Sequence, residues 1–402
     1  MMKAIVHIGT PKTGTTAAQV RFSGGREALL EAGIFYPETL GAQHHLKLAT
    51  ACRSASRPER GFKLFNIRNE KDHANFREQL RKEFAAELEA AKKAGAHTCL
   101  ISSEWLYGRL TKTEEIDEMR RFLAPFFEDV LVIVWLRPQV EFLLSLASTL
   151  CRNGDPVTEK KLKSMITSNE TFYYDQMMKL WEGVFGKDGV KVFPYTRKPD
   201  VVATIFELIG ATAALPDTGE RINSKLGVRL MAMANQIRVP HANHARDSGW
   251  DRRQYFQKID SPEDLKIDLK VAREIQSVFE AGNKALIGRH AELSGKDLDP
   301  DWSRFGSSSN IALLDQDCAF SSELTQLIGM MENDLKIQRA LTEMALAEVD
   351  MLKSSQGEAK KHLNTARKLL EAAETETYIA GHLESAHQRL SRLTEKSLKP
   401  VA

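Results

Sequence analysis

The chain has 402 residues, 42% of them hydrophobic, enough to bury the core of one large domain or of two to three smaller ones. The formal net charge of +2 lies far below that of a dedicated nucleic-acid-binding protein, so no nucleic-acid partner is predicted. The cysteines are too widely spaced to indicate a zinc knuckle or a disulfide framework; they are Cys52, Cys99, Cys151 and Cys318.

The first two hundred residues alternate predicted strands with predicted helices. Runs rich in β-branched and apolar residues predict strands at 3–9, 97–105, 129–138 and 189–195. Helical periodicity predicts helices at 13–22, 26–33, 71–94, 115–127, 139–150 and 177–186. This alternation predicts an α/β fold in three layers, a parallel sheet flanked by helices on both faces, with ligands at the carboxyl ends of the strands. The glycine loop after the first predicted strand makes the expected fold one of the P-loop type.

The apolar run at the N-terminus is interpreted as the first buried strand and not as a signal peptide. No apolar run approaches the ~20 residues of a transmembrane helix. We therefore expect a cytoplasmic protein without a transmembrane segment.

A change in composition predicts two domains, an α/β domain at 1–317 and a helical extension at 318–402. In the extension, apolar positions separated by steps of four and three residues form a heptad pattern with a weak middle: Leu324, Ile328, Met331, Leu335, Gln338, Thr342, Ala345, Val349 and Leu352. Gly357 is expected to interrupt this helix before a second one. Two alternatives stay open. The helices fold back on the domain or on each other, or they associate between copies as a coiled coil.

The stretch "HIGTPKTGTT", His7–Thr16, follows the first predicted strand and opens a predicted helix. Such a loop presents backbone amides and a helix N-terminus to an anion, as in phosphate-binding loops. In the Walker pattern G-x-x-x-x-G-K-[ST], however, the lysine follows the second glycine. Here Lys12 precedes Gly14, and the apolar strand predicted at 129–138 carries Arg137 at its exit, where an NTPase has an acidic residue for Mg²⁺.

Two motifs resemble those of the sulfotransferases that use 3′-phosphoadenosine 5′-phosphosulfate (PAPS). "PKTGTT" is similar to their 5′-phosphosulfate loop, and "LRPQVEFLLS" places an arginine and a serine eight positions apart, as in their 3′-phosphate motif. The chain most resembles the bacterial branch, over roughly residues 3–310. The resemblance implies that Arg137 and Ser145 bind the 3′-phosphate. It also implies a 5′-phosphosulfate site, with Lys12 near the bridging oxygen, formed by Pro11, Lys12, Thr13, Gly14, Thr15 and Thr16.

The implied reaction transfers a sulfuryl group from PAPS to an acceptor hydroxyl and releases 3′,5′-ADP. A sulfuryl group carries less charge than a phosphoryl group, so a lysine and backbone amides can stabilise the leaving phosphate, and no metal is required. Glu104, at the end of a predicted strand, is the predicted catalytic base. Histidine serves as the base in some families of this kind, so His44 and His45, with Ser103, are predicted acceptor-site residues.

Departures from the family pattern bear on the acceptor. Ala17 stands where many cytosolic members have a tryptophan, so adenine must stack elsewhere. The R-K-G-x-x-G-x-W-K segment of the small-molecule branch is missing, which favours a carbohydrate, a glycolipid or another polar hydroxyl compound. The segment around Asn223 is a candidate for closure over the nucleotide, and His241 and His244 lack a third metal ligand nearby in sequence. Two other functions stay open: a small-molecule kinase using ATP and Mg²⁺, and a non-catalytic nucleotide-binding scaffold.

Overall fold

The computed structural model describes residues 2–10, 12–153, 155–196, 200–213, 215, 226–236, 263–315, 321–353, 355–373 and 380–397. The chain divides into two compact units. The α/β unit comprises residues 1–146, 162–223 and 267–308, and the helical unit comprises residues 147–161, 224–266 and 309–402. The helical unit therefore includes segments that the sequence placed in the first domain.

The α/β unit is built on five parallel strands in the order β2-β3-β1-β4-β5. The strands are β1 (Lys3–His7), β2 (Ile34–Phe35), β3 (Thr98–Ser102), β4 (Asp129–Leu136) and β5 (Val190–Pro194). The predicted parallel α/β fold is thus confirmed. The sequence predicted four of these strands, and β2 was not among them.

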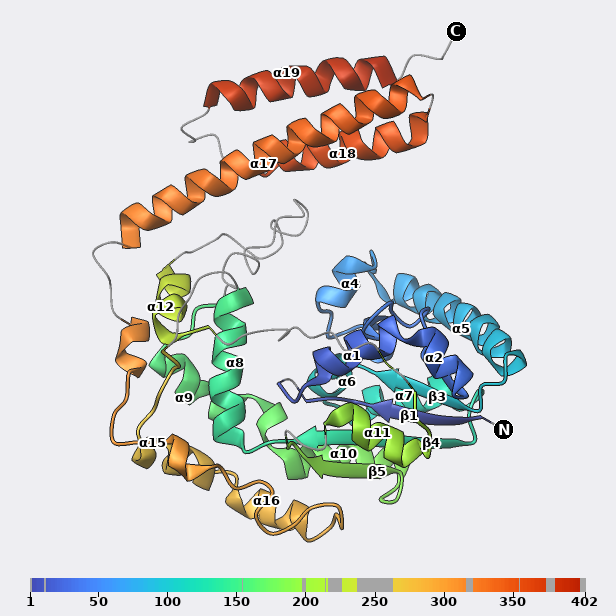
Figure 1. Cartoon of the computed structure of the whole chain (residues 1–402), viewed down its shortest axis with the longest axis vertical. Coiled ribbons are helices and arrows are strands. Elements are labelled where there is room, and N and C mark those ends of the chain that lie inside the picture. Colours follow the sequence, from blue (N-terminus) through green and yellow to red (C-terminus); the bar gives the residue numbers. More distant parts are fainter. Residues whose placement is uncertain are drawn as a thin grey trace. The chain divides into compact units, whose positions relative to one another are not determined.

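Helices cover both faces of the sheet (Figure 1). One face packs against α1 (Thr15–Gly24), α2 (Arg26–Glu31) and α11 (Val201–Ile209). The other face packs against α3 (Leu46–Cys52), α5 (Glu70–Lys93), α6 (Glu104–Arg109), α7 (Thr113–Leu123), α10 (Tyr174–Phe185) and α16 (Glu280–Ile287). The interior strand β4 is apolar on both sides for this reason, with Val132 and Val134 in one core cluster and Ile133 and Trp135 in the other.

The remaining described helices before the tail are α4 (Arg60–Leu64), α8 (Gln139–Asn153), α9 (Glu159–Ser168), α12 (Val228–Gln236) and α15 (Leu269–Ser277). They divide between the two units: α4 and α15 belong to the α/β unit, α12 belongs to the helical unit, and α8 and α9 each contribute residues to both. Helix α8 follows Arg137 and Pro138 directly, so β4, the arginine and this helix form one continuous strand-to-helix connection, as predicted.

The C-terminal tail folds back on itself. Helices α17 (Ser321–Leu352), α18 (Gln356–Glu371) and α19 (Ala380–Ser397) pack around one apolar cluster that includes Ile337, Met344, Leu363 and Leu390. The sequence predicted two helices with a break at Gly357. Instead, α17 ends at Leu352 and α18 begins at Gln356, so Gly357 is the second residue of α18 and not the break. None of the helices in the described part of the chain is both long and apolar enough to cross a membrane.

Candidate functional site

The carboxyl edge of the sheet brings the predicted motifs together. Strand β1 lies between β3 and β4, and His7 at its end pairs with Ser102 of β3 and Ile133 of β4. The chain therefore crosses from one side of β1 to the other between β3 and β4. Such a switch in strand order opens a crevice at the carboxyl ends of the strands, where ligands of α/β proteins bind. The glycine loop follows β1 directly into this crevice.

Three residues of the loop have positive φ angles, Gly9 (+44°), Lys12 (+71°) and Gly14 (+77°). A Cβ at position 9 would lie 2.9 Å from the Cγ2 atom of Thr15, so only glycine fits there without rearrangement. Gly14 is the N-cap of α1, and because it has no side chain it offers no oxygen to the amides of the first turn. Those amides and the positive end of the helix dipole are left to attract an anion.

The threonine hydroxyls stabilise the loop through hydrogen bonds to backbone carbonyls. Thr10 Oγ1 donates a hydrogen bond to the carbonyl of Trp135 at 2.7 Å, and Thr13 Oγ1 donates to the carbonyl of Thr10 at 2.7 Å. Thr15 Oγ1 also donates to the Thr10 carbonyl, at 3.3 Å. All three residues are buried, whereas Thr16 is half-buried. The hydroxyl protons of Thr13 and Thr15 are therefore already used within the loop, which leaves the backbone amides as the donors that could face a bound anion.

Arg137 lies beside the loop, although 125 positions separate it from Lys12 in the sequence. Its Nη1 atom donates a hydrogen bond to the Lys12 carbonyl at 3.3 Å, and its Nη2 atom donates to Glu141 Oε2 at 2.8 Å. Its guanidinium lies 5.7 Å from the centre of the Tyr195 ring, and Tyr174 donates a hydrogen bond to its backbone carbonyl. The structure therefore brings the two predicted phosphate motifs into contact.

The guanidinium group of Arg137 can still donate a hydrogen bond to a ligand. Its Nε atom is buried and has no hydrogen-bond partner in the described part of the chain. Glu141, which neutralises one side of the fork, is shared with Arg304, whose Nη1 atom lies 3.0 Å from Glu141 Oε2. Ser145 is buried on α8, two helical turns after the start of the helix. An incoming anion could thus displace Glu141 from Arg137 while that carboxylate keeps its pair with Arg304.

Glu104 begins α6 directly after β3, and a buried glutamine holds its carboxylate. Gln19 Nε2 donates to Glu104 Oε2 at 2.9 Å and to Ser102 Oγ at 3.3 Å. Ser102 Oγ in turn lies 2.9 Å from His7 Nδ1. Burial lowers the pKa of His7 to about 3, so this ring is neutral at pH 7. A hydrogen-bonded chain thus runs from beneath the glycine loop to the predicted base.

The two adjacent histidines have different surroundings. His45 is fully buried, and its Nδ1 atom accepts from the Ser102 amide while its Nε2 atom donates to the Pro37 carbonyl, each at 2.9 Å. Burial lowers its pKa to about 3. Both ring nitrogens hold the chain after β2 against the end of β3, which leaves neither for an acceptor.

His44 and Ser103 have buried polar atoms without partners among the described residues, namely His44 Nδ1 and Ser103 Oγ. Trp105 Nε1 is also buried and has no hydrogen-bond partner among the described residues. The Trp105 ring packs edge-on against His44, with 6.4 Å between the ring centres. A buried polar atom without a partner costs about 1–3 kcal/mol, which a bound polar group would relieve. Ser103 and Trp105 flank Glu104 in the sequence, and His44 contacts the Trp105 ring, so these unpartnered atoms lie close to the predicted base along the chain or through that contact.

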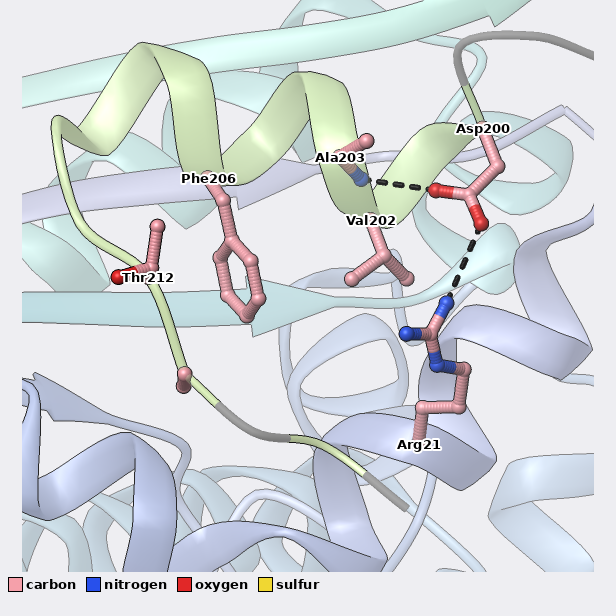
Figure 2. A pocket seen from close by; sticks show the side chains of 7 residues that line it. Arg21, Asp200, Val202, Ala203, Phe206 and Thr212 are labelled. Carbon is pink, nitrogen blue, oxygen red and sulfur yellow. Dashed lines mark hydrogen bonds and ion pairs between the residues drawn. The ribbon is translucent and has the colours of Figure 1, made fainter. Parts of the chain in front are cut away.

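A separate pocket of about 520 Å³ lies between α1 and α11 (Figure 2). Arg21 and Asp200, which form an ion pair at 3.2 Å, lie at one side of it, and the side chains of Val202 and Phe206 point into it from α11. None of the predicted site residues lines this pocket. The sequence contained no motif for it.

Several predicted residues lie outside the described part of the chain: Pro11, Asn223, His241, His244 and Cys318. Among the residues that sequence reasoning missed are Gln19, Glu141 and Tyr195. His7 was a missed signal as well, because a histidine at the last position of a strand before a glycine loop necessarily borders the site. Within the residues described, no group of three or more histidine, cysteine or acidic side chains is arranged to hold a metal ion.

Comparison of the chain with protein-family models, with curated proteins and with solved structures found no match.

Proposed function

We propose that this chain is a sulfotransferase that moves a sulfuryl group from PAPS to an acceptor hydroxyl and releases 3′,5′-ADP. The observation that carries the proposal is the contact between its two phosphate motifs, in which Arg137 Nη1 lies 3.3 Å from the carbonyl oxygen of Lys12. A nucleotide with phosphates at both its 5′ and 3′ positions needs two such anion sites side by side. ATP, with its phosphates in a single chain, does not.

In the proposed donor complex, the 5′-phosphosulfate binds the loop amides and the N-terminus of α1. The 3′-phosphate binds the planar fork of Arg137 and the hydroxyl of Ser145. Attack of the acceptor oxygen forms a new S–O bond and breaks the bond from sulfur to the bridging oxygen. Negative charge then builds up on the leaving 5′-phosphate, where Lys12 and the loop amides stabilise it.

The acceptor hydroxyl must lose its proton as it attacks, and Glu104 is the proposed base. Its position supports this role, since it follows the end of β3 next to β1 and is only half-buried. Gln19 donates a hydrogen bond to one carboxylate oxygen and leaves the other, Oε1, for the acceptor. The unpartnered polar atoms of His44 and Ser103 favour an acceptor with several hydroxyls, such as a carbohydrate, a glycolipid or another polar metabolite.

Calorimetry with 3′,5′-ADP and with ATP plus Mg²⁺ tests the proposal. We expect the wild-type chain to bind 3′,5′-ADP and to bind ATP more weakly, because ATP lacks the 3′-phosphate that Arg137 receives. Tight binding of ATP with Mg²⁺ and not of 3′,5′-ADP would identify a kinase and refute the proposal. Binding of neither nucleotide would favour a scaffold whose function lies in the helical unit.

The base is tested separately, with labelled PAPS and a panel of glycans, glycolipids and polar metabolites. Glu104→Gln keeps the size of the side chain and its place beside Gln19 but cannot accept the proton. We expect it to bind 3′,5′-ADP like the wild type and to lose at least ~100-fold in turnover. Full transfer activity in this variant would show that another group is the base.

A further inference from the structure

Helix α17 has two faces, and among the side chains that the structure describes only one of them is buried against the rest of the bundle. Ile337, Ala340, Met344 and Ala347 form a stripe on α17 that is at most 1% exposed and packs against α18 and α19. These three helices lie against one another (Figure 1). A helix at the surface of such a bundle ordinarily presents charged and polar residues on its other face.

The other face of α17 is instead largely apolar. Met331, Leu346, Val349 and Leu352 are 52%, 43%, 43% and 87% exposed. Wherever side-chain burial is described along α17, each exposed residue occupies position a, d or e of the heptad in which Ile328 is an a position. We call this set the outer face: Met331, Gln338, Arg339, Thr342, Ala345, Leu346, Val349 and Leu352. It coincides with the heptad seam, and it is not the stripe that packs on α18.

The residues beside this seam match a second, parallel copy of the same helix. In a parallel coiled coil, a g position of one helix faces the e position five residues further along its partner. The sequence gives four such pairs along this heptad, namely Leu327 with Glu332, Asp334 with Arg339, Leu341 with Leu346, and Glu348 with Lys353. Two pairs join opposite charges, one joins apolar side chains, and one sets a leucine against a glutamate. Within one chain, Glu348 is also paired with Arg389 at 3.0 Å, and Leu341 packs partly against the cluster shared with α18 and α19, so these two pairs lie at the border between the bundle and the proposed interface. In an antiparallel pair, g positions would face each other and bring the acidic Asp334 and Glu348 together.

We propose that the outer face of α17 is an interface with the same face of a second copy of this chain, in a parallel, in-register dimer. The self-complementary pairs favour this occupant over an unrelated partner. Gln338 and Thr342 lie at d and a positions in the middle of the seam, where polar residues fix register at some cost in stability. The proposal concerns only the helical unit and does not depend on the proposed sulfuryl transfer.

The mass of the full chain in solution is the first test, by light scattering and sedimentation equilibrium. We expect a species of twice the chain mass of 45.2 kDa at micromolar concentrations. The double variant Val349→Asp, Leu352→Asp should be monomeric, because it places four carboxylates in the dimer seam. Both residues are exposed within one chain, so its fold should tolerate the change, and circular dichroism checks that helix content is kept. Lys360→Glu, at an exposed position on α18, is the matched control and should remain dimeric.

Orientation is tested by cross-linking in a Cys318→Ser background, where the cysteines that remain are buried. Leu352→Cys should form disulfide-linked dimers under mild oxidation, since a parallel, in-register pair brings both copies of residue 352 together, whereas an antiparallel pair that overlaps along the whole of α17 holds them apart. Lys360→Cys should not. Arg339→Asp should weaken the dimer at least tenfold, and the added change Asp334→Arg should restore it.

Three results would overturn the proposal. One is a full chain that stays monomeric at tens of micromolar. The second is a dimer that survives the double aspartate variant, which would place the interface elsewhere. The third is a dimer that needs the outer face but forms no disulfide in the Leu352→Cys variant, which would exclude the parallel register.

Discussion

Replacing Arg137 with alanine tests the proposed nucleotide site most directly. The fork can give a phosphate two charge-assisted hydrogen bonds, each contributing about 1.5 kcal/mol, so the variant should lose about 3 kcal/mol of binding free energy. That loss corresponds to an approximately 100-fold weaker Kd for 3′,5′-ADP. The fold should tolerate the change, since Glu141 keeps its ion pair with Arg304 at 3.0 Å and is not left as an isolated buried charge.

Calorimetry should compare 3′,5′-ADP with 5′-AMP, which lacks the 3′-phosphate. In the wild type we expect the diphosphate to bind about 100-fold more tightly than the monophosphate, on the same estimate of two charge-assisted hydrogen bonds. In Arg137→Ala this difference should shrink to the small contribution of the Ser145 hydroxyl, while the affinity for 5′-AMP changes little. Arg121→Ala removes an exposed arginine from α7 and controls for the loss of one positive charge.

The reasoning fails if the variant weakens 5′-AMP as much as 3′,5′-ADP. Arg137 would then act through its hydrogen bond to the Lys12 carbonyl, by holding the loop, and not through a 3′-phosphate. It fails also if Arg137→Ala leaves both affinities unchanged with the loop intact. In either case the pairing of Arg137 with Ser145 would have no functional meaning.

Three further predictions concern the loop, the base and the buried histidines. Gly9→Ala should destabilise the chain by about 1–2 kcal/mol in urea unfolding, because φ is +44° and the new Cβ meets Thr15, while Gly108→Ala, where a Cβ meets nothing within 4 Å, should cost less. Gln19→Leu should lower kcat about tenfold without changing the Kd of 3′,5′-ADP; equal loss in Gln79→Leu, which breaks an exposed Gln–Glu pair on α5, would contradict a specific role. Burial keeps His7 and His45 neutral in the folded chain, whereas both side chains take up a proton below about pH 6.5 when the chain is unfolded. Each histidine should therefore lower the free energy of unfolding by about 1.4 kcal/mol per pH unit as the pH falls from 6.5 toward 3. A free energy of unfolding that stays flat between pH 6.5 and about 5 would show that these rings are not buried in solution.

Much of the fold could be predicted because its signals are local. Strand β4 is a long apolar run, and α5 repeats Leu80, Phe84 and Leu88 on one face, so period and length identify each element. The contact between Lys12 and Arg137 could also be predicted from the sequence. In a parallel sheet, the residues that follow neighbouring strands necessarily share one edge. Strand β2 has only two residues, and it exists as a strand because β3 pairs with it, which no local pattern reveals.

The contacts around the base depend on tertiary structure and could not be predicted. Gln19 lies on α1 and Glu104 begins α6, and nothing in their spacing brings the amide to the carboxylate. His45 likewise resembled a ligand-binding histidine in the sequence, but its surroundings decide otherwise, since a backbone amide and a carbonyl occupy both ring nitrogens. The type of a side chain shows which chemistry is available to it, whereas its partners decide whether that chemistry remains free.

In the C-terminal tail, periodicity identifies an apolar stripe on the helix but does not show which stripe the chain buries. The heptad from Leu324 to Leu352 is a real pattern, but the chain buries a different stripe of α17, through Ile337 and Met344, against α18 and α19. Periodicity counts apolar residues along a helix and does not show which neighbour covers them. A helix with two apolar stripes satisfies one of them within its own chain. The second stripe stays exposed at a cost in hydrophobic free energy, and we infer that a second copy of the helix offsets that cost.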